Sequence, residues 1–218
     1  MAIVRSVISI AAARHWHIHQ MDVYNAFLQE DLYEEVYMTL PEGFSGEFGN
    51  SQACKLSDAG ILIHQRKYAL ELISDMGLAG GKPVSTPMKL NQKLTTVEFD
   101  DNIPPTHPDE MLKDPASYQR LIGRLLYLTT TRSNISFAVQ CLSQFMHSPK
   151  ASHMKATLRL VRYLKSAPGL GILMSFVGGT ELKVFCDADW GACINSRRSV
   201  TWYLIQYGGS LISWKSKK

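Results

Sequence analysis

Apolar residues recur at helical spacing through the middle of the chain, in three consecutive stretches. The first follows Asp114, a residue type that caps helices, and Pro115, which suits a first helical turn. The second ends at Ser148-Pro149 and the third at Pro168-Gly169. Their apolar positions are Tyr118, Leu121, Ile122 and Leu125, then Ile135, Val139, Leu142 and Met146, then Met154, Leu158, Val161 and Leu164. The spacing predicts three helices that bury their apolar faces on one another.

After Gly178-Gly179, apolar residues alternate with polar ones instead. Alternation over 182–186, 199–206 and 211–214 predicts three strands, and Gly208-Gly209 is typical of a hairpin turn. No covering helix accompanies this unit in the sequence. We therefore expect it to leave an apolar face and an open sheet edge.

The N-terminal part combines short helical and strand-like patterns. Residues 2–14 predict a helix, 15–23 a strand, 25–28 a short helical stretch and 35–40 a short strand. The positions at helical spacing in the first stretch are Ile3, Val7, Ile10, Ala11 and Arg14. This stretch also imitates a secretory signal, but it is short and polar residues follow at once, so a helix is the better interpretation. Helices and strands in separate blocks indicate an α+β fold.

Composition limits the class of protein. The chain has 218 residues, 45% of them hydrophobic, which is enough for a sizeable core. Lys and Arg number 23 against 19 Asp and Glu, a net charge of +4, and 19% charged residues excludes a coiled coil. No apolar run is long enough to cross a bilayer, and the four cysteines lack metal or redox spacing, which suits an intracellular protein, cytoplasmic or nuclear. Six of the nine prolines fall between Gly80 and Pro115, which predicts a linker or an extended surface segment.

Positive charge concentrates between Lys150 and Lys165, where five cations occur without an acidic residue. Three of them, Lys155, Arg159 and Arg162, repeat at helical spacing and could track a phosphate backbone. The solvated face of an amphipathic helix explains the same pattern equally well. Any polyanion site should lie on this stretch.

Carboxylates at two places in the sequence could bind metal ions. Asp22 lies where a strand gives way to a helical turn and could hold a divalent cation beside a phosphate, with Phe27 closing over a sugar. A helix cap is the alternative for Asp22. Asp187 and Asp189 are two residues apart, so they share one strand face and favour a cation between them. A solvated strand end is the alternative there.

A third group consists of histidines. His15, His17 and His19 share one face of the expected strand and could in principle bind zinc. A usual zinc site needs a fourth group, for which the sequence offers no clear candidate. A partly exposed strand face is therefore the preferred interpretation.

Several longer motifs carry a family resemblance. In chain order they are residues 19–28, 35–38, 41–44, 65–70, 118–128, 162–165 with 168–171, 187–190, 197–199 and 211–218. Together they resemble the Pol polyprotein of copia-type retrotransposons, over its reverse transcriptase and the start of its ribonuclease H domain. The implied fold is a palm and fingers remnant, a helical thumb or connection segment and an incomplete ribonuclease H-like unit.

The resemblance implies roles for the matching residues. Asp22 would be the first metal-binding carboxylate of the polymerase site. The backbone of Asn25 and Ala26 would face the incoming triphosphate, and Phe27 would exclude a ribose 2′-hydroxyl. Asp187 would be the first metal ligand of the ribonuclease H site. Both reactions use paired Mg²⁺ ions and act on RNA, DNA or an RNA/DNA hybrid.

Departures from the family change the expected function. The Tyr-Val-Asp-Asp motif of the palm is absent, and the direct join of Leu56 to Ser57 deletes the segment that should hold it. Phe99-Asp100-Asp101 imitates the pair, but it lies in the proline-rich segment, where a linker sets its geometry. The remaining ribonuclease H ligands would come from beyond Lys218.

We therefore expect a catalytically inactive Pol fragment. Its expected parts are 1–56 (N-terminal reverse transcriptase), 57–113 (post-palm segment and proline-rich linker), 114–176 (helical connection) and 177–218 (start of ribonuclease H). One alternative is a nucleic-acid-binding module that uses the 150–165 stretch without catalysis. Another is an active reverse transcriptase whose palm is missing from this sequence because exon boundaries were misassigned.

Overall fold

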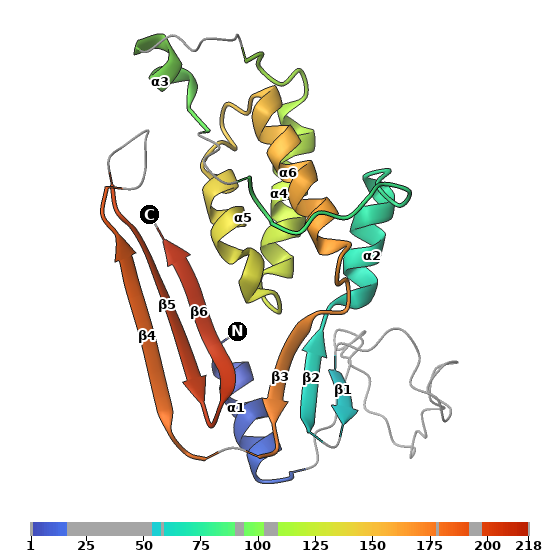
Figure 1. Cartoon of the computed structure of the whole chain (residues 1–218), viewed down its shortest axis with the longest axis vertical. Coiled ribbons are helices and arrows are strands. Elements are labelled where there is room, and N and C mark those ends of the chain that lie inside the picture. Colours follow the sequence, from blue (N-terminus) through green and yellow to red (C-terminus); the bar gives the residue numbers. More distant parts are fainter. Residues whose placement is uncertain are drawn as a thin grey trace, which may run out of the picture.

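Apart from the N-terminal helix, helices and antiparallel strands occupy separate parts of the molecule (Figure 1). The computed structural model describes residues 2–16, 54–57, 59–89, 94–102, 109–177, 179–191 and 198–217. In chain order the elements are helix α1 (Ala2–Ala13), strands β1 (Cys54–Ser57) and β2 (Gly60–His64), helices α2 (Arg66–Asp75), α3 (Val97–Asn102) and α4 (Pro115–Leu128), the 3₁₀ turn η1 (Ser133–Ile135), helices α5 (Ser136–Ser143) and α6 (Ala151–Leu164), and strands β3 (Gly171–Ser175), β4 (Leu182–Asp189), β5 (Val200–Tyr207) and β6 (Ser210–Lys217). The α+β class expected from the sequence is confirmed.

The main hydrophobic core lies among α2, α4, α5 and α6. The three helices expected between 114 and 165 are confirmed, and Asp114 caps α4 by accepting hydrogen bonds from the N–H groups of Ala116 and Ser117. Tyr118 is fully buried and donates its hydroxyl to the carbonyl of Leu142 at 2.7 Å. Burial raises the pKa of Tyr118 to about 12. These helices therefore close a core of their own, to which α2 adds Leu72.

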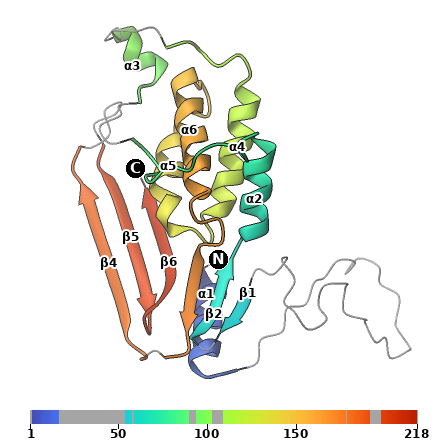
Figure 2. The same ribbon diagram turned by 45° about the vertical axis from the view of Figure 1, so that its right-hand side comes forward.

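A first antiparallel sheet has the order β1-β2-β3 and joins segments far apart in the sequence (Figure 2). Its strands come from three of the four parts expected from the sequence. Gly60 and Gly171 allow β2 and β3 to pair, because a Cβ at either position would lie 2.2 Å or less from a backbone oxygen of the opposite strand. In Figure 2 this sheet lies below the helical core, and β2 leads directly into α2.

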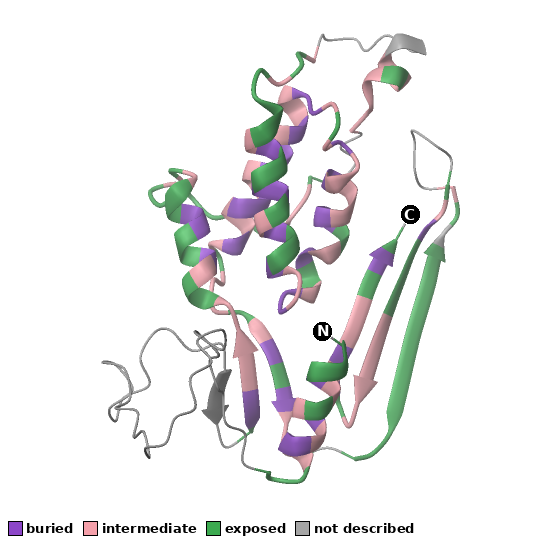
Figure 3. Ribbon diagram, turned by 180° about the vertical axis from the view of Figure 1, so that it is seen from behind, coloured by how far each residue is buried: buried purple, intermediate pink, exposed green. Residues whose placement is uncertain are grey.

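A second antiparallel sheet has the order β4-β5-β6. The expected hairpin is confirmed: Gly208 and Gly209 have φ angles of 53° and 85°, which a two-residue turn of this kind requires. The expectation of an uncovered face is wrong for β6, because α1 and α5 pack against it. Trp214 Nε1 donates to the carbonyl of Thr129 and to the hydroxyl of Ser136, at 3.2 and 3.0 Å. Residues 182–188 of β4, by contrast, are exposed (Figure 3).

Helix α1 lies between the two sheets and contacts β3 and β6. The helix is confirmed, but only part of the expected face is buried. Ala11 is buried as expected and Ile3 and Val7 are exposed, while Arg5, Ser9 and Ala12 are buried as well. The small side chains of Ser9 and Ala12 allow the close approach to both sheets that Ile3 and Val7 would prevent.

The turn after α1 contradicts part of another expectation. His15 has a φ angle of 53° and is not in a strand, so the strand predicted from this residue is wrong at its start. The rest of that strand, including His17 and His19, lies outside the described residues. No helix in the described part of the chain is long and apolar enough to cross a membrane.

Candidate functional site

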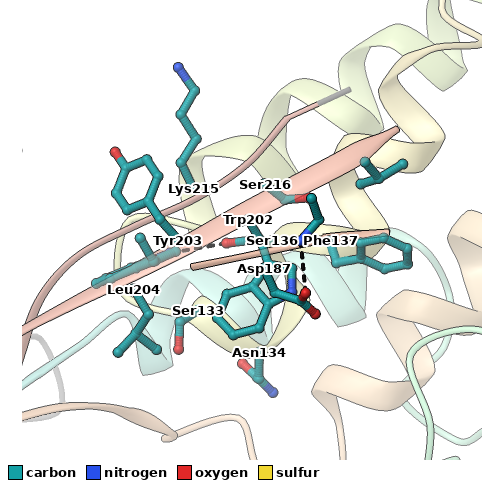
Figure 4. A pocket seen from close by; sticks show the side chains of 13 residues that line it. Ser133, Asn134, Ser136, Phe137, Asp187, Trp202, Tyr203, Leu204, Lys215 and Ser216 are labelled. Atoms are coloured by element: carbon teal, nitrogen blue, oxygen red, sulfur yellow. Dashed lines mark hydrogen bonds between the residues drawn. The ribbon is translucent and has the colours of Figure 1, made fainter. Parts of the chain in front are cut away.

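A row of side chains crosses the β4-β5-β6 sheet. Asp187 of β4 lies opposite Trp202 of β5, which lies opposite Ser216 of β6, so all three point to one face. The row lines one wall of a pocket of about 560 Å³. Asn134 of η1 and Phe137 of α5 line the other wall (Figure 4). The pocket therefore lies between the sheet and the helical region.

The polar groups of this pocket differ in how well they are satisfied. Asp187 is exposed, and one carboxylate oxygen accepts a hydrogen bond from the N–H of Ala188 at 2.8 Å. The amide of Asn134 is already occupied, since it donates to the hydroxyl of Tyr163 at 2.8 Å. Ser216 is 7% exposed, and among the described residues its hydroxyl has no hydrogen-bond partner. Asp187 and Ser216 thus keep capacity for a ligand.

A metal ion at Asp187 would need more ligands than β4 supplies. Asp187 and Asp189 lie two residues apart in the same strand, as expected. Across the described ranges, no three His, Cys, Asp or Glu residues gather closely enough to hold a metal. Mg²⁺ takes six oxygen ligands and usually keeps waters or substrate phosphates among them. The carboxylate of Asp187 therefore supplies only part of a coordination shell.

The basic stretch forms one face of α6. Arg159 donates to the hydroxyl of Thr86 at 2.8 Å, and Arg162 donates to the carbonyl of Lys82 at 2.9 Å. Lys155 is exposed. The acceptors are neutral, and among the described residues no acid lies within ion-pairing distance of these three cations. Their positive charge therefore remains uncompensated.

Residues 78–89 form the segment that crosses this face, and we call them the strap. Lys165, at the end of α6, donates from Nζ to the carbonyls of Leu78 (3.4 Å), Ala79 and Gly81 (2.6 Å). With the contacts of Thr86 and Lys82, these bonds fix the strap without regular secondary structure. The part of the proline-rich region that contains Pro83 and Pro87 therefore runs across α6 as a segment without helix or strand.

The fifth cation of the stretch is buried. Lys150 forms an ion pair with Asp100 and donates to the hydroxyl of Thr95 at 3.1 Å. Burial raises the pKa of Asp100, but hydrogen bonds from Lys150 and Thr95 outweigh it, so the pKa lies below its usual value. Asp100 is in helix α3 rather than a hairpin, and its carboxylate is occupied.

His153 belongs to the same buried cluster. Its Nδ1 accepts a hydrogen bond from the N–H of Lys150 at 3.0 Å, its Nε2 lies 3.1 Å from the carbonyl of Thr95, and its ring stacks on Phe145. Burial and the nearby charge of Lys150 lower the pKa of His153 to about 4. The cluster fastens the segment before α4 to the start of α6.

The chain is similar in sequence to known proteins. Residues 1–59 match the model of the reverse transcriptase (RNA-dependent DNA polymerase) family. The Pol polyprotein from transposon RE2 of Arabidopsis thaliana is 27% identical over 309 aligned positions, which cover 99% of this chain and 20% of that protein. The Pol polyprotein from transposon TNT 1-94 of Nicotiana tabacum is 26% identical over 323 positions, covering the whole of this chain and 23% of that protein. The chain belongs to the retrotransposon Pol polyprotein family.

Shorter relatives exist beside the Pol polyproteins. An uncharacterized mitochondrial protein of Arabidopsis thaliana, AtMg00240, is 40% identical over 96 residues, which cover 40% of this chain and 86% of that protein. No solved structure matches the chain. The chain spans about a fifth of the length of the Pol relatives that it matches.

The alignments agree with an internal deletion. They exceed the length of this chain by 91 and 105 positions, so both Pol relatives carry residues that have no counterpart here. The match to the reverse transcriptase model ends at residue 59, next to the join of Leu56 to Ser57. In the structure this join lies within β1, which pairs directly with β2.

The polymerase-site residues predicted from the Pol resemblance lie outside the described residues. They are Asp22, Asn25, Ala26 and Phe27. The structure brings Asp187 together with Trp202 and Ser216, which the sequence analysis did not single out. The hairpin at Gly208-Gly209 indicates that Trp202 lies opposite the end of β6, but regular counting pairs it with Lys215 rather than Ser216.

Proposed function

We propose that this chain is a retrotransposon polymerase remnant that binds nucleic acid but neither extends nor cleaves it. The observation that carries the proposal is the excess of the alignments over the chain, 91 and 105 positions, in a sequence that lacks Tyr-Val-Asp-Asp. A two-metal site needs carboxylates from separate segments. Asp22 would remain without the second pair.

The acidic groups that do remain support this proposal. Asp100-Asp101 is the sole Asp-Asp pair in the sequence, and Asp100 is occupied by Lys150. At the other site, Asp187 and Asp189 would hold Mg²⁺ only with ligands from outside β4. A nucleotide could still contact Asn25, Ala26 and Phe27, but it would not be added to a primer.

The basic face of α6 supports binding to RNA, DNA or their hybrid. Lys155, Arg159 and Arg162 hydrogen-bond to neutral groups or to none among the described residues, so their charge attracts a polyanion. Such binding requires no metal. We place the protein inside the cell, in the cytoplasm or nucleus, where these partners occur.

Catalysis is tested with the full chain in Mg²⁺. We expect no primer extension on an RNA template and no cleavage of the RNA strand of a hybrid. An Asp22→Asn variant serves as the control for contaminating polymerase. Extension by the natural sequence that disappears in Asp22→Asn would overturn the inactive assignment.

Binding is tested by fluorescence anisotropy with a labelled RNA/DNA hybrid over a series of salt concentrations. We expect K155Q/R159Q/R162Q, which keeps hydrogen-bond donors, to lower the slope of log K against log salt by about 2.5. The matched control, K67Q/K113Q/K217Q, removes the same charge from exposed positions elsewhere. Equal slopes for the two variants would exclude α6 as the binding face.

Sequencing the transcript across the codons for Leu56 and Ser57 tests the sequence itself. We expect the message to join the two codons directly. A message that contains the palm with its Asp-Asp pair would instead favour an active reverse transcriptase with Asp22 as a metal ligand.

A further inference from the structure

We propose that the pocket beside Asp187 binds an unpaired guanine base, stacked on Trp202 with its Watson–Crick edge on the Asp187 carboxylate. This inference rests on the proposed binding of nucleic acid and identifies a second, base-specific contact. It is separate from the basic face of α6, because the pocket lies on the β4-β5-β6 sheet.

The aromatic groups supply the stacking surface. Trp202 is 42% exposed and Phe137, on the opposite wall, is 52% exposed, so both rings are open to a ligand. The second indole of the pocket is different: Trp214 has its N–H occupied, and the Arg5 guanidinium lies 3.9 Å from its ring centroid. An unpaired base stacks readily on an exposed indole. Trp202 is therefore the side chain available for it.

Asp187 selects the base. An ionised carboxylate only accepts hydrogen bonds, and at Asp187 one oxygen accepts from Ala188 while the carboxylate stays exposed. Guanine presents two adjacent donors, N1–H and N2–H₂, which match two carboxylate oxygens. Adenine and cytosine present one donor beside a ring nitrogen that repels the second oxygen. Figure 4 shows the carboxylate beside the Trp202 ring, where such an edge would lie.

Ser216 provides an independent reason to expect a polar ligand. It closes the same row on the covered side of the sheet, and its buried hydroxyl lacks a partner in the described part of the chain. An unsatisfied buried hydroxyl is costly, so a ligand that offers it a hydrogen bond gains affinity. A planar base with polar groups on several edges suits a row of carboxylate, indole and hydroxyl.

The test titrates the full chain with guanosine monophosphate and measures binding by tryptophan fluorescence. We expect saturable quenching, with adenosine, cytidine and uridine monophosphates bound about tenfold more weakly or worse. Asp187→Asn should remove the preference for guanine, and Trp202→Leu should abolish the quenching. Trp190→Phe is the matched control, since Trp190 is 93% exposed and does not line the pocket.

The outcomes separate this inference from the proposed function. Equal affinity for all four nucleotides, or an unchanged preference in Asp187→Asn, would overturn the guanine pocket. A response to Mg²⁺ alone, lost in Asp187→Asn and without a response to guanosine monophosphate, would overturn it in favour of a metal ligand. Binding of the hybrid duplex through α6 is measured on the same protein, so either site can fail while the other stands.

Discussion

The helical core and the β4-β5-β6 sheet bury their apolar residues to very different extents. Leu125, Leu160 and Leu164 are fully buried among the helices, whereas Leu182 and Val184 of β4 are 60% and 59% exposed. Each helix offers one apolar stripe, and four such stripes close on one another. The sheet packs β6 against α1 and α5 but leaves β4 open. Burial of apolar residues therefore stabilises the helical core more than β4. The exposed strand β4 is accessible to a ligand.

Buried cationic side chains also differ between the two regions, with Arg159 as an exception. In the helical region, Arg132 is buried but donates to the carbonyl of Ala167 at 2.7 Å, and Lys150 pairs with Asp100. The exception is Nε of Arg159 in α6, which has no hydrogen-bond partner among the described residues. Between α1 and the sheets, Arg5 is 8% exposed, its pKa is lowered by burial, and its Nε and Nη1 have no hydrogen-bond partner in the described structure.

A matched pair of leucines tests the comparison most strongly. We expect Leu160→Ala to lower the free energy of unfolding by about 4 kcal/mol, because it leaves a cavity in a closed core. Leu182→Ala in β4 should change it by less than about 0.5 kcal/mol. Urea denaturation followed by circular dichroism measures both. Similar losses in the two variants would show that β4 is covered in solution.

Acidification should weaken the helical region through His153. Its pKa is about 4 in the folded protein, below the ordinary value of 6.5, so the unfolded chain binds a proton first as pH falls. The stabilisation is complete above pH 6.5 and is lost between pH 6.5 and 4, by roughly 3 kcal/mol. Protonation of Asp100, whose pKa is also lowered, acts in the same direction at lower pH.

Unfolding titrations at several pH values measure this loss. The charged groups facing His153 are Lys150, Asp100 and Asp109. His153→Gln cannot titrate, so its stability should vary less over pH 6.5 to 4 than that of the natural protein. An unchanged pH profile in this variant would assign the acid sensitivity to other groups.

The helical part of the fold was predictable because its signals are local. Asp114 and Pro115 marked the start of α4, and apolar spacing marked the faces of α4, α5 and α6. For α1 the same spacing was right for Ala11 but wrong for Ile3 and Val7, which are exposed. The residues that pack with Ala12 are Ile61, Ile172 and Met174, which are distant in sequence, so no local pattern records them.

The candidate site was predictable only in part, for a geometric reason. Asp187 and Asp189 followed from strand alternation. Counting from the hairpin pairs Trp202 with Lys215, but an irregularity between Ile205 and Gln206 shifts the register by one and brings Ser216 opposite Trp202. A one-residue shift exchanges the two faces of a strand. The row that defines the pocket thus depends on a bulge that the sequence does not announce.

Two lysines, Lys155 in α6 and Lys165 directly after it, test which contacts hold the strap in place. We expect Lys165→Met to lower the free energy of local opening of the strap by about 1.5 kcal/mol. The reason is that three backbone carbonyls of the strap lose a charged hydrogen-bond donor. Lys155→Met should have no such effect, since Lys155 is exposed on the same helix. Amide hydrogen exchange over 79–89 should become roughly tenfold faster in the first variant alone. Equal exchange in both would mean that the strap is held by its other contacts.

The smallest expected effect concerns two exposed acids, Asp114 and Asp187. Variants of the two distinguish an effect on the free energy of unfolding from an effect on guanine binding. Asp114→Ala removes the cap of α4 and should lower the free energy of unfolding by about 1 kcal/mol, because two N–H groups lose their acceptor. Asp187→Asn should change it by less than about 0.5 kcal/mol, since its one hydrogen bond among the described residues is to the adjacent N–H. Denaturation and guanosine monophosphate binding are measured on both variants. If Asp187→Asn destabilised the chain more than Asp114→Ala, Asp187 would be part of the sheet's structure, and its loss of guanine binding would no longer identify a contact.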